Sequence, residues 1–417
     1  MIRRAAIYTL AASLALATTS TLACTGISLE SQDGAHTRGR TLEFAFPLQS
    51  NVIVVPAGKE FTATLPDGSN GISYRTRYNI VGANAVNKTL IVDGVNDQGL
   101  SIGLFYFPGY AKYATATKEN ASRALAPQDF GMWVLGNFTT VDEVKRAVKD
   151  IVMVPTPLPG LGSAKGEVAP GHFFLRDKNG QSIAIEPVDG KLQVTDAPVG
   201  VMTNAPTYDW QMTNLDNYIN LTTENVSTEK LGAVTLSQTG SGSGLLGLPG
   251  DFTPPSRFVR AAIFSQNAVP NANAEDAVFA SFHILNQFDI PKGSMMNGSV
   301  GKPSPEITEW TMVHDLTNLR TYFRTYQDQS IRMVDMKEAM KAAGGEIAVI
   351  EMGASKQPVS NVSAEAKSMT VKHASADLHD PSHREWSGSG SDPGAVFRCT
   401  PPKLSHFRTD WREVCSE

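Results

Sequence analysis

The sequence predicts an α+β fold in which two antiparallel sheets are covered by helices. Strand patterns and helix patterns alternate in blocks between Cys24 and about Met352, and the helices come in pairs between groups of strands. A parallel sheet would instead need a single helix after each strand. The 417 residues are 41% hydrophobic and only 18% charged, which supports a large buried core and excludes a mainly disordered chain.

The strands are expected in three groups. The first group covers residues 51–55, 90–92 and 100–105, where apolar and β-branched side chains are bounded by Pro56 and by a turn with Gly and Asn. The second is a hairpin over residues 172–175 and 182–185, because Asn179 and Gly180 between them are a strong turn signal. The third group covers residues 309–313, 319–323 and 330–334.

The helix pairs are expected between these groups. Residues 127–138 form the first helix, and Thr140 and Glu143 have the spacing of a capping box that opens the second. In the later pair, Thr253 is expected to cap a helix that begins at Pro254, and another helix covers residues 274–288.

Residues 1–23 have the layout of a secretory signal peptide. Arg3 and Arg4 are followed by an apolar stretch over residues 5–17 and by small and polar residues up to Ala23. The apolar stretch is shorter than the ~20 residues that a transmembrane helix needs. We therefore expect no membrane span, cleavage after Ala23, and a periplasmic or secreted chain that begins with Cys24.

A cysteine at the first mature position has two explanations. One is a lipid-anchored binding protein without catalysis, although Leu22 stands one place late for the usual lipoprotein signal. The other is an enzyme whose α-amine, with an unperturbed pKa of ~7.7–8.0, takes the proton of the adjacent thiol. Cys24 supplies both groups on one residue.

Signals for other kinds of site are weak. With 41 acidic and 36 basic residues the net charge is −5, so the basic surface of a nucleic-acid-binding protein is missing. The glycines of residues 242–247 match a dinucleotide motif, but Pro249 follows where that motif needs a helix. His379 and His383 have a metal-ligand spacing that Pro381 disrupts. We expect no cofactor, metal or nucleic acid.

The C-terminal residues 356–417 are expected to be an appendage, because they are poor in aliphatic side chains and contain Gly/Ser and Pro stretches. Residues 24–355 would then form the folded domain. Cys399 and Cys415 in the extension are expected to form a disulfide in an oxidising compartment.

Several motifs follow one another in a recognisable order. They are Cys-Thr-Gly-Ile at 24–27, Gly-Arg-Thr-Leu-Glu-Phe at 39–44, Asp-Gly-Val-Asn at 93–96, Gly-Leu at 99–100, Tyr-Phe-Pro at 106–108, Gly-Val-Met-Thr-Asn-Ala-Pro at 200–206, Tyr-Asp-Trp at 208–210, Gly-Leu-Pro-Gly-Asp-Phe-Thr-Pro at 247–254, Arg257, and Phe-His-Ile-Leu at 282–285. In this combination the chain resembles the choloylglycine hydrolases, which include bile salt hydrolases and penicillin V acylases. The resemblance implies the four-layer αββα fold of N-terminal nucleophile hydrolases and the hydrolysis of a linear amide.

The resemblance also implies roles for individual residues. Cys24 would be the nucleophile and its α-amine the base, while Arg40 would lie beside the thiol and favour the thiolate. Glu43 stands where the family usually has aspartate, and its carboxylate would orient the amine. Asn204 would supply the side-chain donor of the oxyanion hole. Arg257 matches a second active-site arginine.

Tyr106 carries two implications of the resemblance. Its backbone N–H would be the other oxyanion donor, and its side chain indicates the substrate, because penicillin V acylases have tyrosine there and bile salt hydrolases asparagine. We therefore expect penicillin V acylase-like activity first, with N-acyl homoserine lactones as plausible natural amides, and conjugated bile salts second. Relatives of this kind are often homotetramers, so a tetramer is expected here.

Overall fold

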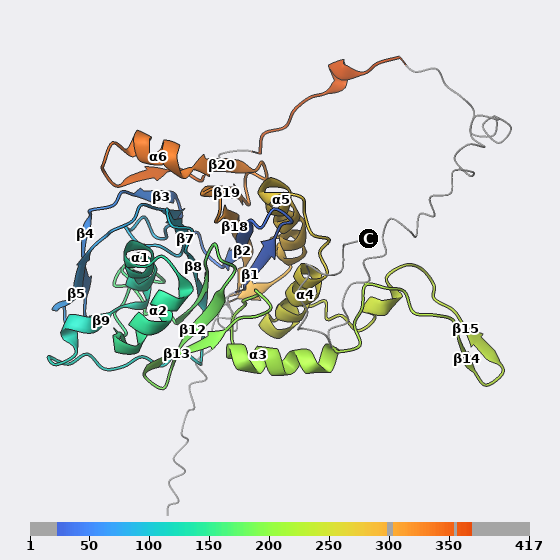
Figure 1. Ribbon diagram of the computed structural model, residues 1–417, viewed down its shortest axis with the longest axis horizontal. Coiled ribbons are helices and arrows are strands. Elements are labelled where there is room, and N and C mark those ends of the chain that lie inside the picture. The colour runs from blue at the N-terminus through green and yellow to red at the C-terminus, as the bar shows by residue number, and fades with distance from the viewer. Residues whose placement is uncertain (1–22, 298–302, 354–356, 369–417) are drawn as a thin grey trace, which may run out of the picture.

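The computed structural model describes residues 23–297, 303–353 and 357–368. Two antiparallel sheets form its centre (Figure 1). The smaller sheet has five strands in the order β1-β2-β18-β19-β20. These are β1 (Cys24–Glu30), β2 (His36–Phe44), β18 (Ile307–Asp315), β19 (Arg320–Thr325) and β20 (Arg332–Asp335).

The larger sheet has eight strands in the order β13-β12-β11-β8-β7-β6-β3-β21. These are β3 (Val52–Val55), β6 (Ile80–Ala83), β7 (Asp93–Asn96), β8 (Ser101–Tyr106), β11 (Gly171–Arg176), β12 (Ser182–Val188), β13 (Lys191–Asp196) and β21 (Ala348–Ile350). The predicted hairpin is confirmed, since β11 and β12 pair antiparallel around Asn179 and Gly180. The strand predicted at residues 90–92 is wrong, because the regular strand begins only at Asp93.

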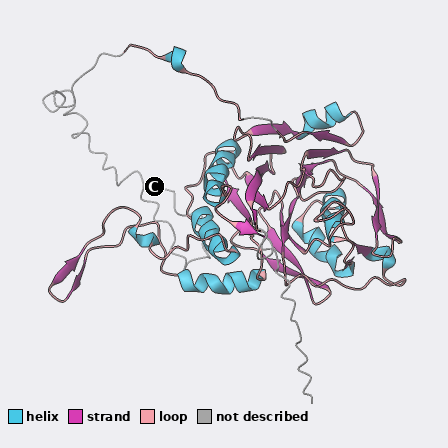
Figure 2. Cartoon of the chain, turned by 180° about the vertical axis from the view of Figure 1, so that it is seen from behind, coloured by secondary structure: helices cyan, strands magenta, loops and turns pink. Residues whose placement is uncertain are grey.

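Helices cover the outer face of each sheet (Figure 2). They are α1 (Pro127–Asn137), α2 (Val141–Ala147), α3 (Tyr208–Leu215), α4 (Pro254–Gln266), α5 (Ala274–Leu285) and α6 (Met336–Ala343). Helix α1 packs on β7 and β8, whereas α4 packs on β1 and α5 on β2 and β18. Both predicted helix pairs are confirmed, and so is the αββα order of layers.

The two apolar layers follow from the alternation of side chains along the strands. Phe173 and Phe174 are neighbours on β11 and point to opposite faces of the sheet. Phe173 packs against Phe130 of α1, with ring centroids 4.4 Å apart. Phe174 belongs to the core between the sheets, together with Ile27 and Phe105. The larger sheet is therefore buried on both faces.

The helix starts agree with the predicted positions but not with every predicted cap. Thr140 accepts the Glu143 N–H at 3.3 Å, as expected, but the Glu143 carboxylate accepts the backbone N–H of Thr139 at 2.7 Å. At α4 the Thr253 side chain makes no cap bond. Asp251 instead accepts hydrogen bonds from the Thr253 N–H at 2.8 Å and the Ser256 hydroxyl at 2.7 Å. An acidic side chain organises this helix start.

Smaller elements lie at the edges of the sandwich. The short strand pairs are β4 (Glu60–Thr64) with β5 (Asn70–Arg75), β9 (Ala124–Leu125) with β10 (Val152–Met153), β14 (Glu229–Leu231) with β15 (Val234–Leu236), and β16 (Met296–Asn297) with β17 (Ser304–Pro305). The short 3₁₀ turns are Ala121–Arg123, Val148–Asp150, Asp216–Tyr218, Ser243–Leu245, Asn286–Phe288 and Ser363–Glu365. The β14–β15 hairpin projects from the body of the protein (Figure 1).

The chain stays part of the folded body as far as residue 352. Strand β21 pairs with β3, and Met352 is buried. Residues 358–368 are exposed. The predicted disulfide between Cys399 and Cys415 and the histidines at 379 and 383 lie outside the described residues.

Two further findings concern only the part of the chain that the structure describes. None of its helices combines the length and the apolar character needed to cross a membrane. It also contains no group of three or more His, Cys, Asp or Glu residues arranged to hold a metal ion.

Candidate active site

Cys24 is the first residue of β1, and its side chain is buried in the core between the sheets. Strand β1 pairs with β2 so that Cys24 lies opposite Leu42. Burial raises the pKa of the Cys24 thiol, and the positive charge of Arg40 opposes that rise without cancelling it. The predicted lowering by Arg40 is present, but the net shift is upward. A thiol of this kind needs a base before it can attack.

Arg40 lies on β2 and is completely buried. Its guanidinium carbon is 4.1 Å from the ring centroid of Phe105, and Nη1 donates to the Leu104 carbonyl at 2.5 Å. Nε is 3.9 Å from a carboxylate oxygen of Asp93. Among the described residues, Nη2 has no hydrogen-bond partner. Nε also donates to the Thr41 carbonyl at 3.1 Å, so Arg40 is held by an aromatic face and two carbonyls, and its charge is only partly compensated.

Asp93 is a buried carboxylate between the two sheets that no sequence argument had given a role. It receives two hydrogen bonds of 2.9 Å from Arg38 and is 2.6 Å from Nε2 of His314. Burial alone would raise the pKa of Asp93, but Arg38 and His314 outweigh it and lower the pKa to about 2. This network fixes β2 and β18 against β7 directly behind Arg40.

Asn204 brings the nucleophile and the predicted oxyanion residues together. Its Oδ1 accepts hydrogen bonds from the backbone nitrogen of Cys24 at 2.8 Å and from Nη2 of Arg257 at 2.7 Å. Its Nδ2 donates to the carbonyl of Tyr106 at 2.8 Å. A flipped amide would face two donors with an NH₂ group, so these partners determine its orientation. One hydrogen of Nδ2 is left for another acceptor.

Arg257 lies in the first turns of α4 and is buried against β1. Nη1 donates to the Cys24 carbonyl and, at 2.9 Å, to the hydroxyl of Thr25, while Nε donates to the Phe252 carbonyl at 2.9 Å. With its bond to Asn204, Arg257 holds both the nucleophile's main chain and the oxyanion side chain. Its side chain is therefore part of the site rather than a surface group.

Tyr106 is the last residue of β8, and its side chain is half-buried. Its ring packs edge-on against Phe44, with centroids 5.4 Å apart. Next to it and to Cys24 lies a cavity of about 40 Å³. Apart from Cys24, Arg40, Tyr106 and Gln128, the residues that line it are apolar: Leu42, Phe44, Leu48, Ala85, Leu90, Val92, Leu104, Leu158, Leu161 and Ala169. An apolar part of a substrate bound beside the thiol would contact this apolar lining.

Glu43 is buried on β2 and does not contact the Cys24 nitrogen, which donates to Asn204 instead. Its Oε1 accepts a hydrogen bond of 3.0 Å from the hydroxyl of Thr308. Burial raises the pKa of Glu43 to about 8, although Thr41 and Arg257 act to lower it. Glu43 is therefore mainly protonated at neutral pH, and the predicted contact with the amine is not formed while residue 23 is attached.

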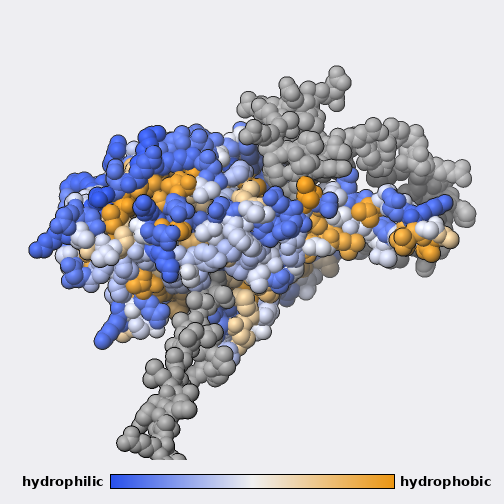
Figure 3. All heavy atoms as spheres, turned by 90° about the horizontal axis from the view of Figure 1, so that it is seen from below, coloured by the Kyte–Doolittle hydropathy of each residue, from blue (hydrophilic) through white to orange (hydrophobic). Residues whose placement is uncertain are grey.

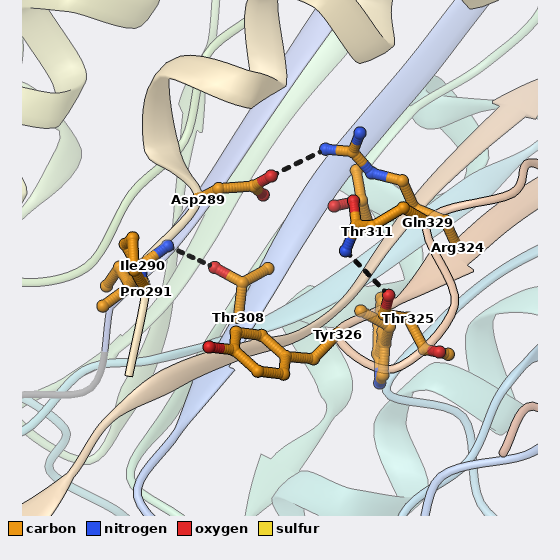
Figure 4. A pocket seen from close by; sticks show the side chains of 10 residues that line it. Asp289, Ile290, Pro291, Thr308, Thr311, Arg324, Thr325, Tyr326 and Gln329 are labelled. Atoms are coloured by element: carbon orange, nitrogen blue, oxygen red, sulfur yellow. Dashed lines mark hydrogen bonds and ion pairs between the residues drawn. The ribbon is translucent and has the colours of Figure 1, made fainter. Parts of the chain in front are cut away.

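Thr308 connects Glu43 to a separate cavity of about 170 Å³ on the helix side of the smaller sheet (Figure 4). The Thr308 hydroxyl accepts the Ile290 N–H at 2.9 Å, and Asp289 and Arg324 form an ion pair of 2.9 Å across this cavity. None of the predicted site residues lines it. Sequence reasoning missed Thr308, because only the pairing of β18 with β2 places it opposite Glu43.

Comparison with known proteins gives the family. Residues 24–344 match the model of the linear amide C–N hydrolases, choloylglycine hydrolase family. A bile salt hydrolase/transferase of Clostridium perfringens is 33% identical over 320 residues, which are 76% of this chain and 93% of that protein. A penicillin V acylase of Pectobacterium atrosepticum is 25% identical over 334 residues, 75% of this chain and 81% of that protein.

Solved structures agree with the fold described above. A mutant of the conjugated bile acid hydrolase from Clostridium perfringens superimposes with a TM-score of 0.71 at 31% identity, over 81% of this chain and 99% of that chain. A penicillin V acylase from Agrobacterium tumefaciens has a TM-score of 0.62 at 22% identity, over 79% and 92% of the two chains, and supports the fold alone. The chain belongs to the choloylglycine hydrolase family and is a hydrolase of carbon–nitrogen bonds in linear amides.

Proposed function

We propose that the protein hydrolyses amides with an apolar acyl group through an acyl-thioester on Cys24. One observation carries the proposal: Asn204 bonds at 2.8 Å both to the Cys24 nitrogen and to the Tyr106 carbonyl, beside an apolar cavity. A nucleophile, its base and two oxyanion donors therefore lie around one point where an amide carbonyl can sit.

The reaction would begin after removal of residues 1–23, which frees the α-amine of Cys24. The amine takes the thiol proton as the sulfur attacks the carbonyl carbon, and charge develops on the carbonyl oxygen. The second hydrogen of Asn204 Nδ2 and the backbone N–H of Tyr106 donate to that oxygen. When the C–N bond breaks, the ammonium returns its proton to the leaving amine. Water then hydrolyses the thioester.

Conjugated bile salts are the first substrate class of this proposal. The bile salt hydrolase/transferase of Clostridium perfringens is 33% identical and is matched over 93% of its length, against 25% and 81% for the penicillin V acylase. These similarities reverse the order expected from Tyr106 alone. The apolar lining beside Cys24 would contact the part of a steroid acyl group next to the reacting carbonyl, since the cavity there measures about 40 Å³.

Amides of smaller aromatic or fatty acids are the second class, and Tyr106 favours them. Tyrosine places a ring rather than a hydrogen-bonding amide at the cavity, where it packs against Phe44. Penicillin V and N-acyl homoserine lactones belong to this class.

The test compares kcat/KM for glycocholate, penicillin V and a long-chain N-acyl homoserine lactone on one preparation. We expect glycocholate to be preferred and Cys24→Ala to abolish turnover of all three. A preference for penicillin V would reverse the order of the two substrate classes. Full activity of Cys24→Ala would refute the mechanism.

We also propose that the chain is exported and that residues 1–23 are removed as a signal peptide. Intact mass of the exported protein is expected to correspond to a chain that begins with unmodified Cys24. A mass increased by a diacylglyceryl group would instead support the lipid-anchored binding protein.

Self-association through the β14–β15 hairpin is a further part of the proposal. Leu231, Val234 and Leu236 are 70%, 58% and 50% exposed at its tip, where apolar residues gather (Figure 3). A second copy of this chain would cover them. Light scattering should give the mass of a tetramer, and Leu231→Ser with Val234→Ser should lower it. An unchanged mass in the double variant would exclude this surface.

A further inference from the structure

Glu306 is a buried acidic residue next to the nucleophile that belongs to none of the sequence motifs. It directly precedes β18, two residues before Thr308, and is fully buried. One carboxylate oxygen accepts the backbone N–H of Ala23 at 2.7 Å, and the other accepts Nδ2 of Asn297 at 3.1 Å. Ala23 itself is only 2% exposed. A buried carboxylate thus binds the main chain immediately ahead of Cys24.

The loss of residue 23 changes what this carboxylate faces. Hydrolysis of the bond between residues 23 and 24 consumes one water, leaves a carboxylate on Ala23 and turns the Cys24 peptide nitrogen into an amine. When the leader departs, Glu306 loses the Ala23 N–H. A buried carboxylate that loses its hydrogen-bond donor is destabilised.

The new amine is the closest replacement for that donor. Successive backbone nitrogens in an extended chain are ~3.5 Å apart, so the Cys24 nitrogen lies within about 6 Å of the Glu306 oxygen that now binds Ala23. A small side-chain movement or one bridging water spans that distance. The charged and titratable groups that face the amine are the Cys24 thiol, Arg40 and Glu43 from β2, Arg257 from α4, and Glu306.

We propose that Glu306 is a positioning residue for the α-amine of Cys24, which it binds once Ala23 has been removed. This inference rests on the proposed function, in which that amine is the base. Asn204 accepts from the Cys24 nitrogen, whereas Glu43 is bonded to Thr308, so Glu306 supplies a second acceptor for the amine.

A negative neighbour stabilises the ammonium form of the amine. A carboxylate within about 4–6 Å typically shifts such a group by one to three pKa units. Replacing Glu306 by Gln keeps the size of the side chain and removes the charge. The pKa of the amine should therefore fall by about one unit, and the acid limb of kcat/KM should move to lower pH by the same amount.

The experiment measures the pKa of the Cys24 α-amine directly. Protein labelled with ¹⁵N-cysteine, with an intact mass that shows a chain starting at Cys24, is titrated by following the ¹⁵N signal of the α-amine. The variants are Glu306→Gln, Glu306→Asp, which restores a charge, and Glu309→Gln. Glu309, three positions further along the chain on β18, is a matched control, because burial raises its pKa, like that of Glu306, to about 7.

We expect a lowered amine pKa in Glu306→Gln, partial recovery in Glu306→Asp and the parental value in Glu309→Gln. An amine pKa in Glu306→Gln equal to that of the parent would overturn the inference. The titration needs no turnover, so it separates this inference from the proposed function. Absence of amidase activity in the parent would count against the function and not against the contact of Glu306 with the amine.

Discussion

Replacement of Asn204 by Asp tests the orientation of the side chain that joins the site. The two side chains have the same shape, and Asp keeps an oxygen for the donors that now lie 2.8 Å away on Cys24 and 2.7 Å away on Arg257. Its other oxygen would face the Tyr106 carbonyl, which Nδ2 now contacts at 2.8 Å. The substitution therefore removes the donor and adds negative charge where the oxyanion forms.

The expected losses of kcat and of stability follow from the loss of the Nδ2 donor. Removal of one oxyanion donor typically lowers kcat by about 10²–10³, or ~2.7–4 kcal/mol. The unpaired Tyr106 carbonyl should reduce the free energy of unfolding by ~1–3 kcal/mol, partly offset by a new ion pair with Arg257.

Steady-state kinetics at saturating substrate and urea unfolding measure the two effects. Asn217→Asp on the exposed surface is the control and should leave both unchanged. An Asn204→Asp enzyme with kcat within tenfold of the parent would refute the assignment of Nδ2 as an oxyanion donor.

Four other outcomes are expected. Thr308→Val removes the hydroxyl between Ile290 and Glu43 and should lower the free energy of unfolding by ~1–3 kcal/mol in urea, whereas Thr308→Ser should not; equal losses would contradict the role of the hydroxyl. Because the pKa of Glu43 is raised from 4.5 to about 8, the folded chain holds a proton that the unfolded chain releases, so stability should fall as pH rises across that interval, by up to ~1.4 kcal/mol per unit. Glu43→Gln should flatten that slope, measured by urea titrations between pH 5 and pH 8, and an unchanged slope would exclude Glu43 as its source. Tyr106→Asn should move the kcat/KM ratio of glycocholate to penicillin V upward by about tenfold, and a shift toward penicillin V would contradict our interpretation of this side chain. A chain that ends after Met352 should keep its kcat, and loss of folding, seen by circular dichroism, would show that the extension completes the core.

The sequence predicted the parts of the site that lie in contiguous motifs. Cys24, Arg40, Tyr106, Asn204 and Arg257 were assigned by resemblance, and the structure places all five around one point. The helix pairs were predictable because their apolar spacing and caps are local. The order of those blocks predicts two antiparallel sheets covered by helices, and the resemblance implies their four-layer αββα arrangement.

The other features of the site could not be predicted, because they depend on strand register and on contacts between segments that are distant in the sequence. Thr308 bonds to Glu43, which lies 265 positions away in the sequence. The pairing of β18 with β2 shifts between Thr308 and Trp310, and no local sequence pattern predicts this shift. Asp93 was visible within a motif, but its bonds to Arg38 and His314 require both sheets to be stacked. The direction in which the pKa of the Cys24 thiol shifts could not be inferred from the presence of Arg40, because burial raises this pKa by more than Arg40 lowers it.

The burial of Ala23 and Cys24 sets an order of events for the maturation that we propose. At 2% and 3% exposure, the bond between them is closed to any separate peptidase once the chain has folded. In that proposed maturation, cleavage by such an enzyme has to precede folding, so the amount of active enzyme depends on the rates of both steps. A chain that folds before cleavage would be stable and correctly folded, but its Cys24 nitrogen would remain in a peptide bond and could not act as the base. Slower folding on export would then yield more active enzyme from the same amount of polypeptide.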